Sequence, residues 1–142
     1  MPRLICSLLV GSALGMSGAL LQGMLKNGLA SPYLLGISAG SGLVIVFFIS
    51  FGLLQSFIPF AAWMGAILTT LIVFILSNDG NKIVVERLVL GGVAISSLFG
   101  AIQATLLLQV EDGRIQAALN WLIGSLNSRG WQEINFAALP IL

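Results

Sequence analysis

One segment of the chain matches the G-x-S-x-G pattern that surrounds the nucleophilic serine of many hydrolases: Gly36-Ile37-Ser38-Ala39-Gly40. In that chemistry a histidine takes the proton of the serine hydroxyl, and this chain contains no histidine. The pattern also needs a preceding strand, whereas Ser31 followed by Pro32 predicts the start of a helix. We therefore interpret these small residues as sites of close helix packing. A membrane-embedded hydrolase that uses Ser38 is the rival interpretation, and we expect a serine-reactive probe to leave the chain unlabelled.

The residues needed for metal binding, disulfide bonds, ATP binding and nucleic-acid binding are also absent or too few. The absence of histidine removes the commonest metal ligand, and the single cysteine, Cys6, excludes an internal disulfide. The sequence contains no G-x-x-x-x-G-K-[ST] loop, so it does not bind ATP through a P-loop. Its 6 Lys and Arg residues are too dispersed to follow a nucleic-acid backbone. We expect no catalytic residue, no metal, no cofactor and no nucleic-acid partner.

Two polar residues, Ser96 and Gln103, lie roughly on one helical face of an apolar segment, together with Gly92. A glutamine within a membrane span usually faces protein or a water-filled path. One interpretation is therefore that these side chains line a transport pathway. The other is that they hydrogen-bond to a neighbouring helix, and the residues by themselves leave both open.

The composition requires a lipid environment. The chain is 58% hydrophobic and 8% charged, and its mean hydropathy is +1.06. A soluble domain carries about 25% charged residues. A soluble protein of 142 residues would have too few polar side chains to cover its surface. We therefore predict an integral membrane protein.

Charged and turn-forming residues divide the chain into apolar segments of spanning length, because about 20 helical residues cross a hydrocarbon core of about 30 Å. We predict an all-α fold, a polytopic membrane helix bundle with about four full spans in a single transmembrane domain over residues 1–142. The expected spans cover residues 4–25, 35–54, 59–76 and 88–110.

The segment over residues 114–127 differs, because its apolar residues lie on one helical face and polar residues occupy other positions. Trp121 and Trp131 are typical of the membrane interface. We predict a short interfacial amphipathic helix here. From about residue 134 the sequence is typical of the start of a fifth span, which nine residues cannot complete.

Small residues recur at every fourth position of the first span, at Gly11, Gly15, Ala19 and Gly23. Small residues at this spacing let two helix backbones approach closely within lipid. We predict that this stripe packs against other helices, either as part of a central helix or as an ordinary packing face.

The Lys and Arg residues do not orient the spans. If successive ends alternate, each side of the membrane receives three cations: Lys26, Lys82 and Arg87 on one side, and Arg3, Arg114 and Arg129 on the other.

In its motifs, the sequence resembles the FecCD-type permeases of ABC importers over nearly its whole length. The most specific stretch runs from Asn27 to Gly40, in which Asn27, Ala30, Pro32 and Gly36 belong to a turn motif of that family. Gly28 departs from the family, which usually has proline there. Further segments that carry the resemblance are Pro2-Arg3-Leu4, Ser17 to Gly23, Arg87 to Ala94 and Trp121 to Leu126, followed by Trp131.

The resemblance implies an orientation. It places residues 26–32 and 77–87 in the cytoplasm, and Arg3 and residues 111–133 outside. Arg3 corresponds to an arginine that pairs with a carboxylate of the docked binding protein, a task that suits the two-pronged guanidinium. Without the resemblance, the residues equally allow Arg3 to mark the end of the first span at the membrane interface. The resemblance also favours pathway lining for Ser96 and Gln103.

The resemblance further implies a function and partners. Such permeases import ferric siderophores, haem or cobalamin across the cytoplasmic membrane of bacteria by alternating access. The expected partners are a second permease copy, identical or paralogous, cytoplasmic ATPase subunits and an extracytoplasmic substrate-binding protein. Because ATP hydrolysis belongs to the separate subunits, this chain is not expected to be an enzyme.

The family's permeases have about ten spans in two related halves, and this chain matches the first half. We therefore expect a fragment of a longer protein, or a truncated gene product without transport activity alone. A small membrane scaffold or assembly subunit is the remaining alternative. The residues do not distinguish which chelate is carried.

Overall fold

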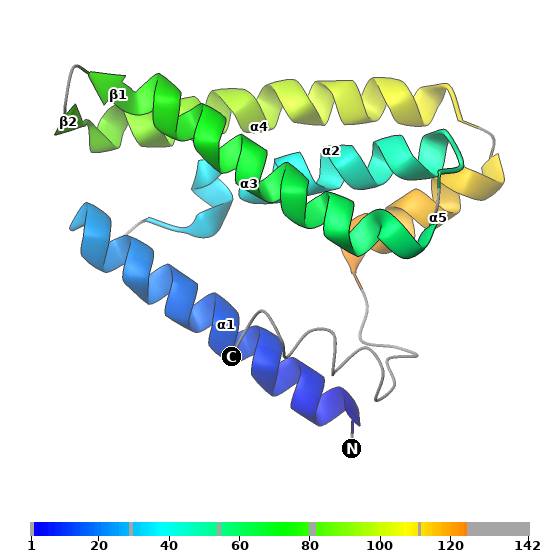
Figure 1. The fold of residues 1–142 in the computed structure, drawn as a ribbon, viewed down its shortest axis with the longest axis horizontal. Helices are drawn as coiled ribbons and strands as arrows, with labels where there is room; N and C mark the ends of the chain where they lie inside the picture. Colours follow the sequence, from blue (N-terminus) through cyan, green and yellow to red (C-terminus); the bar gives the residue numbers. More distant parts are fainter. Residues whose placement is uncertain (1, 29, 54, 80–81, 111, 125–142) are drawn as a thin grey trace. The chain divides into compact units, whose positions relative to one another are not determined.

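The computed structural model describes residues 2–28, 30–53, 55–79, 82–110 and 112–124 (Figure 1). By their contacts, the described residues form two compact units: the first helix belongs to the first unit, and residues 31–123 form the second. The first unit contains α1 (Pro2–Leu25). The second contains α2 (Ile37–Ser50), α3 (Ile58–Ser77), α4 (Val85–Leu108) and α5 (Asp112–Ile123), with short 3-10 turns η1 (Pro32–Leu35) and η2 (Gln55–Phe57). The all-α class predicted from the sequence is confirmed.

Three helices in the described ranges are long and apolar enough to cross a membrane: α1, α3 and α4. Their mean hydropathies are 2.0, 2.1 and 1.7. The charged residues of α1 and α4 lie near one end of each helix and α3 contains none, so a hydrocarbon core would meet uncharged side chains. The protein is therefore an integral membrane protein.

The segment expected as a span over residues 35–54 is divided in the structure. Gly36 has φ +73° and separates η1 from α2, and Gly52 with φ +62° follows the end of α2. Left-handed backbone at these two glycines interrupts the helix. The remaining 14 residues of α2 are about 21 Å long at about 1.5 Å per residue, shorter than α1, α3 and α4.

Between α3 and α4 the chain turns through a short hairpin. Its two-residue strands β1 (Asn78–Asp79) and β2 (Lys82–Ile83) pair antiparallel, with Asn78 opposite Ile83. This is the turn cluster that the polar residues predicted. The amphipathic helix expected over residues 114–127 corresponds to α5, while Trp131 and the span expected from residue 134 lie outside the described residues.

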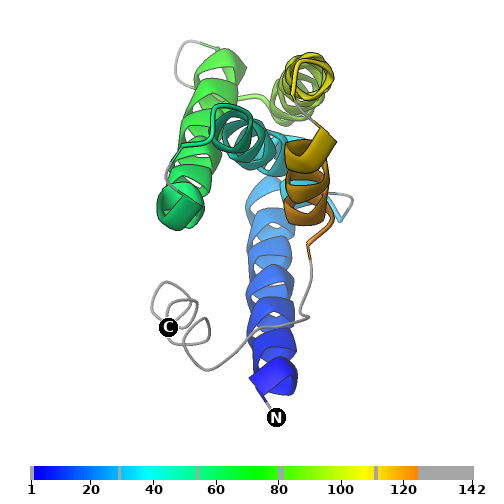
Figure 2. The same ribbon diagram turned by 90° about the vertical axis from the view of Figure 1, so that its right-hand side faces the viewer.

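Within the second unit, α2 is the central helix. It contacts α3, α4 and α5, and Figure 2 shows it between α3 and α5. The buried core joins α2 to the start of α3 and the middle of α5 through Ile45, Val46, Ile49, Ile58 and Ala118. This short helix packs on three neighbours and positions the contacts of Gly40, Gln103 and Arg114 described below.

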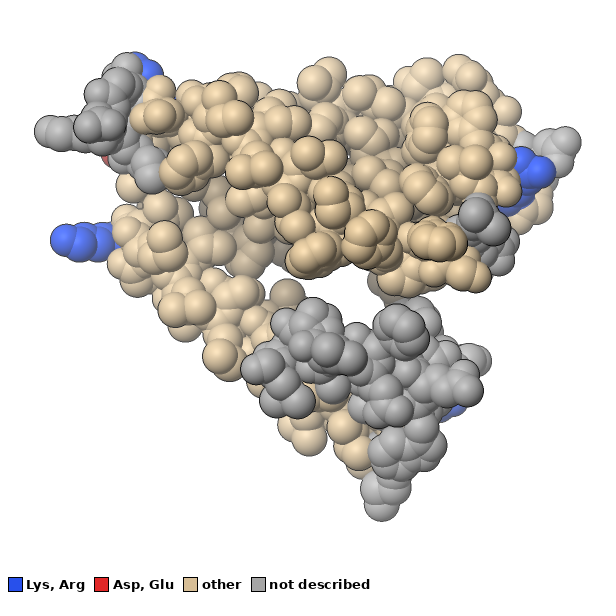
Figure 3. All heavy atoms as spheres, viewed as in Figure 1, with Lys and Arg blue, Asp and Glu red and all other residues tan. Residues whose placement is uncertain are grey.

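The surface is apolar along the helices. In Figure 3 the Lys and Arg side chains of described residues lie at helix ends, and uncharged residues cover the lengths between them. Large apolar side chains such as Leu8, Leu90 and Leu68 are more than half exposed. Such a surface is compatible with lipid and not with water.

Candidate functional site

The turn motif predicted from Asn27 to Gly36 is built from local hydrogen bonds. The Ala30 amide donates to the Asn27 carbonyl at 3.1 Å, and Ala30 is buried. Pro32 begins η1, as the sequence predicted, after Ser31 in extended conformation. The Gly36 amide donates to the Tyr33 carbonyl at 3.1 Å and ends η1.

Gly36 is required for space as well as for its backbone conformation. A Cβ at this position would lie 3.1 Å from the Ser96 hydroxyl and 3.2 Å from the Gly92 carbonyl oxygen of α4. A Cβ on Gly92 would overlap the Leu34 carbonyl oxygen and lie 2.9 Å from the Leu35 Cα. The backbones of η1 and α4 therefore meet directly, through glycines on both sides.

A second close contact joins α2 to α3. A Cβ on Gly40 would overlap the Thr69 hydroxyl and lie 2.8 Å from the Gly65 carbonyl oxygen. A Cβ on Gly65 would lie 2.7 Å from Val44. Gly40 was predicted to serve close packing, whereas its partners Gly65 and Thr69 were missed. Their four-residue spacing is the small-x-x-x-small signal that could have identified them.

Gln103 crosses from α4 to α2. Its side-chain amide donates to the Ala39 carbonyl at 2.9 Å, and its oxygen lies 3.3 Å from where a Cβ on Gly42 would stand. Ser96 donates to the Gly92 carbonyl of its own helix at 2.7 Å. Both predicted lining residues are half-buried on the side of α4 that faces η1 and α2. The structure thus places them in interhelical packing, and pathway lining stays a prediction.

The predicted stripe on α1 has open space around it. A Cβ added to Gly11, Gly15 or Gly23 would meet nothing within 4 Å among the described residues. Arg3 is exposed in the first turn of α1. Helix packing by the stripe and docking by Arg3 both stay predictions.

Ser38 lies exposed in the first turn of α2, and no strand precedes it in the described chain. Within that same part of the chain, no group of three His, Cys, Asp or Glu residues could hold a metal ion.

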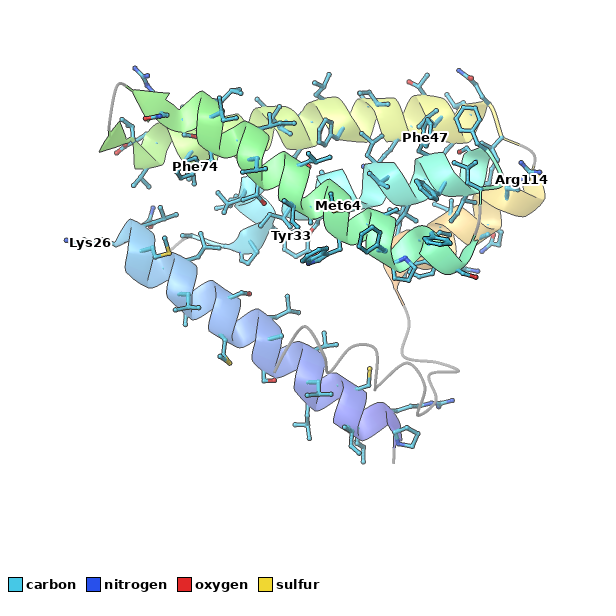
Figure 4. The ribbon with its side chains drawn as sticks, in the orientation of Figure 1. Lys26, Tyr33, Phe47, Met64, Phe74 and Arg114 are labelled. Carbon is cyan, nitrogen blue, oxygen red and sulfur yellow. The ribbon has the colours of Figure 1, made fainter. Side chains whose placement is uncertain are left out.

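Sequence reasoning did not find the contact that one cation makes. Arg114 of α5 reaches the end of α2, where its Nη1 donates to the Ser50 carbonyl at 3.0 Å (Figure 4). Only the charge of Arg114 was visible in the sequence, because its partner lies 64 residues away.

The family model of the FecCD transport family matches residues 1–142. The chain belongs to the FecCD transport family. The resemblance found in the motifs is therefore confirmed, and the matching family is a family of transport proteins.

Among curated relatives, the chain is 33% identical to the cobalamin import system permease BtuC of Halobacterium salinarum, over 100% of this chain and 38% of the relative. It is 35% identical to the iron(3+)-hydroxamate import system permease FhuG of Bacillus subtilis, over 99% of this chain and 44% of the relative. The chain thus spans about two fifths of the length of these relatives.

The fold is also that of a solved structure, described as an inward-facing metal-chelate type ABC transporter. The TM-score is 0.88 at 27% sequence identity, and the match covers 99% of this chain and 45% of the other. The helical bundle is therefore the arrangement found in an ABC transporter.

Proposed function

We propose that the chain belongs to the transmembrane permease subunit of an ABC importer for iron chelates such as ferric siderophores. The observation that carries this proposal is the family match over all of residues 1–142. Relatives named for cobalamin and for iron(3+)-hydroxamate, and a structure named for metal chelates, support a metal-chelate cargo. Within this proposal the cargo moves by alternating access, as the resemblance to the family implies.

The permease acts with partners in the cytoplasmic membrane of a bacterium, as a multi-pass protein. These are a second permease copy, identical or paralogous, cytoplasmic ATPase subunits and an extracytoplasmic binding protein. The helices α1, α3 and α4 cross the bilayer, α2 with η1 supplies a shorter fourth crossing, and α5 lies near the outer surface.

Deleting the full-length gene and measuring uptake of labelled ferric siderophores, haem and cobalamin tests this function. We expect the uptake of one class to fall to background and to return with the wild-type gene. Unchanged uptake of all three would contradict the importer and favour a membrane scaffold. The class that is lost identifies the cargo.

Within this function, Arg3 docks the binding protein and Ser96 and Gln103 line the pathway. The exposure of Arg3 in the first turn of α1 supports docking, because a guanidinium there is free to meet a carboxylate. An Arg3→Glu variant of the full-length protein should bind the binding protein about tenfold more weakly or worse, because two like charges would then face each other. Unchanged affinity and uptake would rule out the docking role.

A further inference from the structure

The helix α5 packs on α2 through one face only. Ala118 is 1% exposed in the core, and Leu122 lies 3.0 Å from where a Cβ on Gly42 would stand. On the exposed side of α5, Gln116 donates to Asn120 at 3.3 Å. Dispersion contacts of this kind are individually weak and together hold a helix against its neighbour.

The carbonyl groups at the end of α2 can be accounted for one by one. The last four carbonyls of a helix have no partner within the helix. The amides of Phe51, Leu53 and Gly52 donate to the carbonyls of Phe47, Phe48 and Ile49 at 3.1, 2.9 and 3.1 Å, respectively. The fourth carbonyl, that of Ser50, accepts from Arg114 of α5.

Charge and shape both favour this contact. A cation is stabilised near the C-terminus of a helix, where the carbonyls concentrate negative charge. Gly52 has φ +62°, and a Cβ there would lie 3.3 Å from the Arg114 Nη1. The turn that ends α2 therefore leaves room for the guanidinium, and a side chain at residue 52 would crowd it.

We propose that Arg114 is a positioning residue, which sets the place of α5 along α2 by completing the C-terminal cap of α2. Fixing α5 fixes the exposed face that it presents at the outer surface to the binding protein. This second step rests on the proposed function. An arginine that merely extends from an interfacial helix toward water would have no such effect.

A distance measurement tests the positioning without any partner. Spin labels are placed at Ile75 of α3 and Asn120 of α5, which are both exposed. The full-length protein carries Cys6→Ser, so that the native thiol is not labelled, and is measured in lipid nanodiscs. We expect one narrow distance distribution for the wild type and a broader or shifted one for Arg114→Ala. Arg114→Lys keeps a donor and the charge and should restore part of the narrow distribution.

Ser50→Ala is the matched control, because it keeps the backbone carbonyl that accepts from Arg114. Within the described part of the chain, the Ser50 hydroxyl is buried without a hydrogen-bond partner, so its removal should leave the distances unchanged. If Arg114→Ala matches the wild type, the positioning role is overturned.

The affinity for the binding protein tests the second step. We expect Arg114→Ala to weaken it about tenfold, Arg114→Lys less, and Ser50→Ala not at all. Altered distances with unchanged affinity would overturn the link to docking. A wild-type protein that recruits no binding protein would count against the proposed function instead, and the distance result would still stand on its own.

Discussion

Gln103 shows what a single polar side chain does in an apolar helix. Its amide donates across to the Ala39 carbonyl of α2 at 2.9 Å. A polar group in lipid that loses its partner is unfavourable, so the hydrogen bond ties α4 to α2. Substituting Gln103 and measuring both stability and uptake distinguishes a packing role from a role in transport.

We expect Gln103→Leu in the full-length protein to lower the free energy of unfolding by about 0.6–1.5 kcal/mol, the value of one interhelical hydrogen bond. The measurement is unfolding in mixed detergent micelles, with Gln109→Leu, an exposed glutamine at the end of α4, as control. Unchanged stability with reduced chelate uptake would favour pathway lining over packing.

Lys26 is notable for its backbone conformation, which is left-handed at the end of α1. It has φ +49°, and the amides of Lys26 and Asn27 donate to the Gly23 and Gln22 carbonyls at 3.4 and 3.2 Å, respectively. This is the C-terminal turn that glycine usually ends. Left-handed backbone costs a residue with a Cβ about 1–2 kcal/mol.

The comparison of Lys26→Gly with Lys26→Ala isolates that cost, since both variants lack the charge. We expect the Asn27 amide to be protected from hydrogen exchange about threefold more in the glycine variant, after part of the gain is offset by the chain entropy of glycine. Equal protection in the two variants would show that the left-handed turn is not under strain.

At the scale of elements, glycines allow the closest approaches between the helices of the second unit. Gly36 and Gly92 bring α4 onto η1, and Gly40 and Gly65 bring α3 onto α2. Thr69 is 2% exposed and donates to the Gly65 carbonyl at 2.7 Å, so it has little room to move aside. The close approach of α2 and α3 therefore depends on the absence of two Cβ atoms.

Gly40→Ala should lower the free energy of unfolding by about 1–3 kcal/mol, because the added methyl group overpacks the contact with Thr69. Gly100→Ala on α4 is the control, since a Cβ there meets nothing within 4 Å among the described residues. That control should be neutral or stabilising by up to about 1 kcal/mol. Unfolding of the full-length variants in micelles gives both values, and equal stability of the two would contradict the close contact.

At the scale of the whole molecule, α1 carries an exposed apolar surface. Only Cys6 is buried along its 24 residues. The stripe of Gly11, Gly15, Ala19 and Gly23 has the spacing that lets helices pack closely. The relatives are more than twice as long as this chain, so the packing prediction concerns the full-length protein.

In that protein, Gly15→Leu should reduce the midpoint of thermal unfolding and the amount recovered from the membrane, because a large side chain would separate the packed helices. Met16→Leu is the comparison, since Met16 is 66% exposed and the change conserves volume. If both variants behave as the wild type does, the stripe faces lipid and not a helix.

The sequence by itself determined the membrane environment, the apolar helices, the helix start at Pro32 and the family. The first three follow from local composition, because hydropathy and backbone preference are properties of neighbouring residues. The family follows from the resemblance carried by the motifs, above all from Asn27 to Gly40. The pairing of Gly40 with Thr69, of Gly92 with Leu34 and of Arg114 with the Ser50 carbonyl was decided only by the tertiary structure. Each pair joins residues far apart in the chain, so its existence depends on how whole helices cross, which no local pattern encodes.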